Sequence, residues 1–149
     1  MAEALGADVI AVDVRRTADD VAVLLHDETL GRMWGDARRV RDVAWCDVAR
    51  LGNGLDRIPR LDGVLERLDG CRSSLLVTVV DPLDAVVAAQ TVSASSWAVA
   101  VAWCGDPEAV AAVRTVVVIR SCSRPCANPR CPPGERCPSV PPCLRQWKA

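Results

Sequence analysis

Two short apolar runs, separated by only a few polar residues, constrain the fold of this chain more than any other feature. The runs span residues 9–14 and 21–25, and the link between them is six residues long. A parallel crossover needs roughly a dozen residues or more, so the two runs should pair as an antiparallel hairpin. The first run contains Asp13, and the second is followed by His26, the only histidine. Strands that present ionisable groups in this way are a common framework for a functional site.

Segments typical of strands and helices alternate along the chain as far as residue 121. We expect strands at residues 8–14, 21–25, 75–80, 97–103 and 116–119, and helices at residues 1–5, 44–51, 60–68 and 83–92. A further helix should begin at Pro107, because Asp106 before it is a typical N-cap. The apolar residues of segment 60–68 recur at helical spacing. Strands that alternate with helices indicate a parallel α/β fold.

Composition and charge narrow the classes of function. The chain has 149 residues, enough for one domain with a core, and its net charge of −1 gives no electrostatic footprint for nucleic acid. No apolar run approaches the roughly 20 residues of a membrane span. The first residues contain neither the basic nor the apolar region of a signal peptide. We therefore expect a cytoplasmic chain that neither binds nucleic acid nor spans a membrane.

The hairpin region carries an ordered set of motif residues. They are Gly6-Ala7-Asp8, Ile10, Asp13-Val14, Thr17, Asp19, His26-Asp27, Thr29-Leu30 and Arg32. This series resembles the signature of the glycerophosphodiester phosphodiesterase family, and segments 57–65 and 103–114 are similar to two further family segments. The resemblance covers residues 1 to about 121 and implies a partial (β/α)₈ TIM barrel, roughly half of the barrel. The family's opening strand, with its His-Arg pair, is then expected before Met1.

The resemblance implies a reaction of lipid and glycerol metabolism, in which a metal-dependent enzyme hydrolyses a glycerophosphodiester to glycerol 3-phosphate and an alcohol. A Glu-x-Asp pair and a later Glu-x-Lys pair hold the metal, Mg²⁺ or Ca²⁺, and two histidines transfer protons. His26 matches the second histidine and is therefore the expected catalytic residue. Asp13 matches the metal-binding aspartate. Outside this resemblance, Asp13 would be a solvent-facing or arginine-paired residue, and His26 a structural histidine.

The remaining site positions depart from the family pattern. Ala11 stands at the first glutamate, Thr78 at the second and Val80 at the lysine, while the first histidine has no counterpart. A hard divalent cation prefers several carboxylate oxygens, and Asp13 supplies one carboxylate. We therefore expect weak metal binding and little or no activity.

The composition changes abruptly after residue 121. Residues 122–149 hold five of the eight cysteines and seven of the ten prolines, with many arginines. The prolines exclude a continuous helix or central strand, so we expect a folded domain at residues 1–121 and an unstructured tail at residues 122–149. The tail has three interpretations: a Cys-rich metal-binding or disulfide module, a disordered linker, or a shifted reading frame. We favour the shifted frame, because the change falls in the middle of the expected barrel.

Two classes of function follow. The chain is either a phosphoric diester hydrolase of this family, acting on a small-molecule glycerophosphodiester, or a non-enzymatic truncated or frameshifted remnant. Because most of the metal-binding carboxylates are missing, this sequence favours the non-enzymatic remnant. An open half-barrel would also leave strand edges unpaired, which predicts poor solubility or self-association of two chains.

Overall fold

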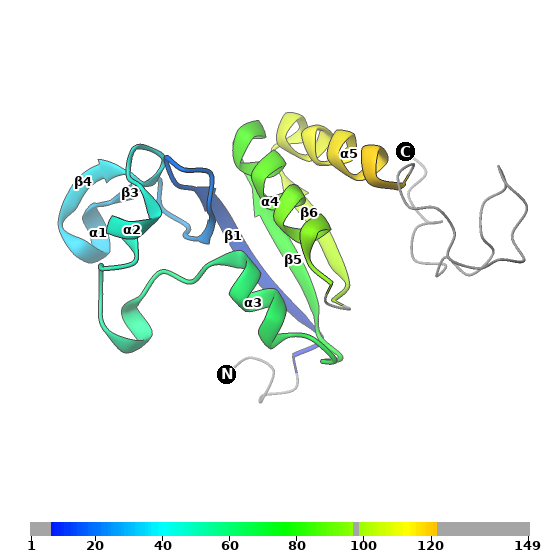
Figure 1. The fold of residues 1–149 in the computed structure, drawn as a ribbon, viewed down its shortest axis with the longest axis horizontal. Helices are drawn as coiled ribbons and strands as arrows, with labels where there is room; N and C mark the ends of the chain where they lie inside the picture. Colours follow the sequence, from blue (N-terminus) through cyan, green and yellow to red (C-terminus); the bar gives the residue numbers. More distant parts are fainter. Residues whose placement is uncertain (1–6, 97–98, 122–149) are drawn as a thin grey trace, which may run out of the picture.

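A four-stranded sheet organises the computed structural model, which describes residues 7–96 and 99–121. The strand order is β2-β1-β5-β6 (Figure 1). The strands β1 (Val9–Arg16), β5 (Ser74–Val79) and β6 (Val101–Gly105) run parallel, and β2 (Ala22–Leu24) pairs antiparallel with the end of β1. The predicted hairpin and the parallel α/β architecture are both confirmed.

Three helices accompany the parallel strands. Helix α3 (Leu61–Arg67) precedes β5, α4 (Pro82–Ala94) connects β5 to β6, and α5 (Pro107–Ser121) follows β6. Helices α4 and α5 lie side by side (Figure 1). Asp81 and Asp106 cap these two helices, because each carboxylate accepts hydrogen bonds from backbone N–H groups of the first turn.

The main core lies on the helix-covered face of the sheet. Leu75, Val77 and Val79 of β5 are fully buried there, among small residues such as Ala85 and Ala109. The opposite face is partly uncovered: Val9 is 55% exposed. The strand expected to be buried at residues 8–14 is therefore buried on one face only. Parallel sheets normally have both faces covered, so the structure leaves one face of this sheet open.

A second, smaller core is formed mainly by the segment of the chain that links β2 to α3. This segment contains β3 (Thr29–Leu30), α1 (Gly31–Trp34), β4 (Asp36–Arg39), the 3₁₀ turns η2 (Val40–Asp42) and η3 (Gly54–Asp56), and α2 (Trp45–Val48). Its buried side chains are Val23, Leu25, Leu30, Val40, Val43, Val48 and Ile58. In Figure 1 it lies beside β1, away from α4 and α5. We refer to it below as the small lobe.

Several sequence-based expectations need correction or lie outside the described residues. The strand expected at residues 116–119 is wrong, because α5 continues to Ser121 and no glycine or proline interrupts it. The helix expected at residues 44–51 is reduced to the single turn α2. The strand expected at residues 97–103 begins only at Val101, and residues 97–98 are not described. The helix at residues 1–5 and the tail at residues 122–149 also lie outside the described residues.

Candidate functional site

The open face of the sheet brings the predicted metal-binding positions together. Asp13 of β1 is in register with Thr78 of β5, and Thr78 with Cys104 of β6. Residues in register on parallel strands point to the same side of a sheet, and residues two apart on one strand share that side. Ala11, Asp13 and Thr78 therefore lie on one face. The Thr78 hydroxyl also lies 3.5 Å from the Cys104 thiol, which places Cys104 on this face too.

These side chains do not fit a hard divalent cation. Asp13 is the only carboxylate among the motif positions on this face, because a methyl group stands at Ala11 and a hydroxyl at Thr78. Within residues 7–96 and 99–121, no group of three or more histidine, cysteine or acidic side chains could hold a metal ion. Ca²⁺ takes six to eight oxygen ligands, commonly including several carboxylates, and Mg²⁺ takes six, commonly including one or two carboxylates and several water molecules.

His26 follows β2, and the preceding residue, Leu25, is hydrogen-bonded to the backbone of β1. The amide of Leu25 donates a hydrogen bond to the Asp13 carbonyl, at 3.0 Å. The His26 side chain is 78% exposed, and its Nδ1 lies 3.1 Å from an Asp27 carboxylate oxygen. The other Asp27 oxygen accepts a hydrogen bond from Arg32. The Arg32 hydrogen bond, and then the His26 contact, lower the pKa of Asp27 below its ordinary value. The contacts of Asp27 with His26 and Arg32 thus hold the loop after β2 at the surface.

A cluster that the sequence analysis missed lies where β1 ends. The Asp84 carboxylate, in the first turn of α4, lies 3.7 Å from Arg15 Nη1 and 3.6 Å from Arg16 Nε. Its side chain is only 8% exposed. Burial, and secondarily the charge of Asp81, raises the pKa of Asp84 above its ordinary value, although both arginines oppose this change. The sequence signals were the arginine pair at a strand end and the acidic residues around Pro82.

This cluster surrounds a cavity of about 50 Å³. Its charged lining residues are Arg15, Arg16, Arg41, Glu28, Asp81 and Asp84. The Nε atoms of Arg15 and Arg16 are buried and have no hydrogen-bond partner among the described residues. Three cations and three carboxylates balance, and a cavity of this volume is large enough to hold water. The cavity therefore suits a bridging water better than a phosphate group.

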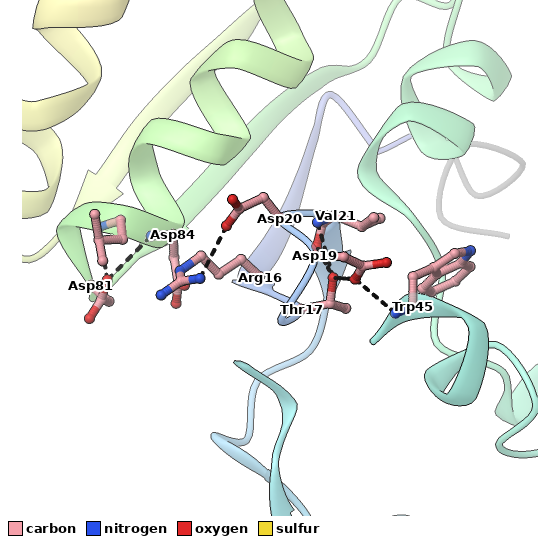
Figure 2. Close-up of polar contacts among 9 residues, drawn as sticks. Arg16, Thr17, Asp19, Asp20, Val21, Trp45, Asp81 and Asp84 are labelled. Atoms are coloured by element: carbon pink, nitrogen blue, oxygen red, sulfur yellow. Dashed lines mark hydrogen bonds and ion pairs between the residues drawn. The ribbon is translucent and has the colours of Figure 1, made fainter. Parts of the chain in front are cut away.

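The turn between β1 and β2 connects the sheet to the small lobe (Figure 2). The Thr17 hydroxyl donates to the Asp19 carboxylate at 2.6 Å and accepts from the Val21 amide at 3.0 Å. The same Asp19 oxygen accepts from the Trp45 amide at 2.8 Å. The Thr17 hydrogen bond, followed by that of Trp45, lowers the pKa of Asp19. Two motif residues, Thr17 and Asp19, therefore have a structural role here.

A larger cavity of about 310 Å³ lies between α3 and α4. Asp20, Arg60 and Asp62 contribute its charged groups, and Thr91 and Ser95 contribute hydroxyls. Neither Asp13 nor His26 lines it. The predicted site residues thus lie elsewhere, on the open face and in the loop after β2.

The fold is an α/β arrangement around a mostly parallel sheet, with the motif positions on its open face and in the loop after β2. The family model of the glycerophosphoryl diester phosphodiesterase family matches residues 1–112. The chain belongs to this family. No helix in the described part of the chain is long and apolar enough to cross a membrane.

Individual relatives agree with this assignment. The probable glycerophosphodiester phosphodiesterase 2 of Mycobacterium tuberculosis is 36% identical over 85 residues, which are 56% of this chain and 32% of that protein. The crystal structure of glycerophosphodiester phosphodiesterase from Agrobacterium tumefaciens superposes with a TM-score of 0.67 and 26% identity, covering 79% of this chain and 54% of that one. The chain spans about a third to a half of the length of these relatives.

A more distant structure has the same fold. An Oleispira antarctica phosphodiesterase, solved in complex with the product sn-glycerol-3-phosphate, superposes with a TM-score of 0.67 at 15% identity. The match covers 76% of this chain and 52% of that protein. The likeness therefore supports the fold assignment.

Proposed function

We propose that this chain is a glycerophosphodiester phosphodiesterase-like polypeptide that has lost the metal-binding part of its site and hydrolyses glycerophosphodiesters at no measurable rate. The described residues correspond to about half of a (β/α)₈ barrel. The ancestral reaction releases glycerol 3-phosphate and an alcohol with the help of Mg²⁺ or Ca²⁺. In this chain His26 and Asp13 are the remaining members of that site.

The observation that carries the proposal is the composition of one face of the sheet. Ala11, Asp13 and Thr78 lie together there, as the family motif requires, but only Asp13 has a carboxylate. A divalent cation neutralises the phosphate oxygens and orients the ester in this kind of reaction. Without several carboxylates, the cation is held mainly by water and both effects are lost.

Three alternatives compete with this proposal. A working hydrolase is favoured by the intact His26-Asp27-Glu28-Thr29-Leu30 motif. A non-enzymatic remnant, truncated or frameshifted, agrees with the abrupt change in composition after residue 121, and a Cys-rich metal-binding module would use residues 122–149. Zinc bound in stoichiometric amount, and lost on truncation at residue 121, would favour that module.

The metal-binding part of the proposal is tested by thermal unfolding in Ca²⁺ or Mg²⁺ and in a chelator. A cation that binds only the folded state raises the melting temperature, so the unmodified chain should melt at the same temperature in all three. The variant Ala11→Glu/Thr78→Glu should gain a Ca²⁺-dependent rise, and the matched variant Ala11→Gln/Thr78→Gln should not. A rise in the unmodified chain that Asp13→Asn abolishes would contradict the proposal.

We also propose that the chain associates with itself through its open sheet. In the part of the chain that is described, β6 has a strand partner on one side only, and β2 pairs with β1 only from Val14 to Arg16. Unpaired strand edges and exposed apolar side chains such as Val9 and Val80 both favour association.

A further inference from the structure

We propose that Asp84 is a positioning residue: through Arg15, it fixes the backbone of His26 against the first turn of α4. The inference goes beyond the proposed loss of metal binding, because it concerns how the loop after β2 is held and does not depend on turnover.

The contacts form a continuous path from the helix to the loop. Arg15 Nη1 lies 3.7 Å from the Asp84 carboxylate, and Arg15 Nη2 donates a hydrogen bond of 3.2 Å to the His26 carbonyl. One planar guanidinium therefore contacts both groups, and its geometry is rigid. Asp84 is almost completely buried, so it restricts the arginine to this orientation.

The second arginine makes Asp84 a shared anchor. Arg16 Nε lies 3.6 Å from the other Asp84 oxygen, and Arg16 Nη1 donates to Asp20 at 3.1 Å (Figure 2). Asp20 is exposed and forms an ion pair with Arg16. Asp84 and Asp20 therefore contact the same arginine, but Asp84 alone is connected to His26 through Arg15. This difference provides a matched control.

Backbone hydrogen bonds on either side of the loop report its opening. The Leu25 amide donates to the Asp13 carbonyl, and the Val40 amide donates to the Glu28 carbonyl. Both amides should exchange with solvent more often when the loop is released. His26 is the only histidine of the chain, so its imidazole gives a single, unambiguous magnetic resonance signal.

The test is amide hydrogen exchange and the imidazole spectrum of the full chain, compared between Asp84→Asn and Asp20→Asn. Asparagine is compatible with the positive φ of 57° at Asp20. We expect Asp84→Asn to weaken the hydrogen bond from Arg15 to the His26 carbonyl. Loss of one such charged hydrogen bond should increase the amide exchange of Leu25 and Val40 on the order of tenfold and shift the His26 signal. Asp20→Asn should change neither. The amide of Val77, in the core strand β5, should keep its exchange rate in both.

A second variant decides the question if Asp84→Asn does not fold. Arg15→Lys keeps the charge, but an ammonium group cannot reproduce the two-sided contact of the guanidinium. It should therefore release Leu25 and Val40 and shift the His26 signal in the same way. Unchanged loop amides and an unchanged His26 signal in the folded variants would overturn the proposal. An equal increase at Val77 would also overturn it, because the effect would then be global destabilisation.

Discussion

Ala11, Asp13 and Thr78 share one face of the sheet, and the chemistry of these few atoms determines what the site can hold. The sequence alone predicted which positions they occupy, because a motif fixes spacing and strand geometry fixes the side of the sheet. It did not predict the Asp84 cluster, which depends on a side chain of α4 lying across the ends of two arginines 68 and 69 positions away. The arginine pair and the acidic residues around Pro82 are visible in the sequence, but local sequence does not show that they meet in the fold.

The buried carboxylate of Asp84 leads to a prediction about pH. Its pKa is raised, so between the ordinary value of 3.8 and the raised value the folded chain binds more protons than the unfolded chain. Stability gained from this group is therefore present at low pH and lost as the pH rises through that window. The free energy of unfolding of the unmodified chain minus that of Asp84→Asn should fall with rising pH.

Urea unfolding of both proteins from pH 3.5 to pH 7, about the range over which an aspartate with a raised pKa titrates, measures this difference. Taking the difference removes the opposite contributions of Asp19 and Asp27, whose pKa values are lowered. A difference that rises with pH would mean that Asp84 is stabilised as an anion by its arginines, against the direction expected from its burial.

Helices and strands can be predicted from the local sequence where the hydrophobic periodicity or a helix-capping residue is clear. Helices α3 and α4 and strands β1 and β5 were predicted close to their observed positions, whereas only the start of α5 was predicted correctly. The β-branched run at residues 116–119 predicted a strand, but helix propensities differ by well under about 1 kcal/mol among such residues, and the helix already begun at Pro107 continues. The small lobe had no such signal, because its elements are one turn or a few residues long.

Two glycines give a prediction about these elements. Gly105, at the end of β6, has φ of 120°, and a Cβ there would lie 2.0 Å from the Val79 carbonyl oxygen of β5. Gly63, inside α3, has no atom within 4 Å of such a Cβ. Gly105→Ala should reduce the free energy of unfolding by on the order of 2–3 kcal/mol. Gly63→Ala should increase it by about 0.5–1 kcal/mol.

Urea unfolding followed by circular dichroism measures both changes with the same method. Each variant adds one methyl group to a glycine, so the pair separates the effect of position from that of side-chain size. Equal effects of the two substitutions would mean that the close approach of β5 and β6 at Gly105 is not a real constraint.

The molecule as a whole combines a well-packed helical face with an open one. Val9, on the open face, is 55% exposed, and Met33, in α1 of the small lobe, is 53% exposed. If the open face mediates self-association, Val9→Lys should increase the monomer fraction and Met33→Lys should leave it unchanged, because only Val9 is part of that surface. Light scattering after size-exclusion chromatography measures the fraction. A monomeric unmodified chain with a cooperative melt would contradict this account.

The loss of the metal-binding set is the central claim, and an assay of product release tests it most directly. Glycerol 3-phosphate release from glycerophosphocholine is measured in Mg²⁺ or Ca²⁺, for the unmodified chain and for His26→Ala. Losing one acid–base group typically costs on the order of 10²–10⁴ in rate, and losing the metal site adds to this. We predict that both proteins release product only at the rate of the protein-free reaction. Turnover by the unmodified chain that His26→Ala abolishes would contradict the account and show that the site works.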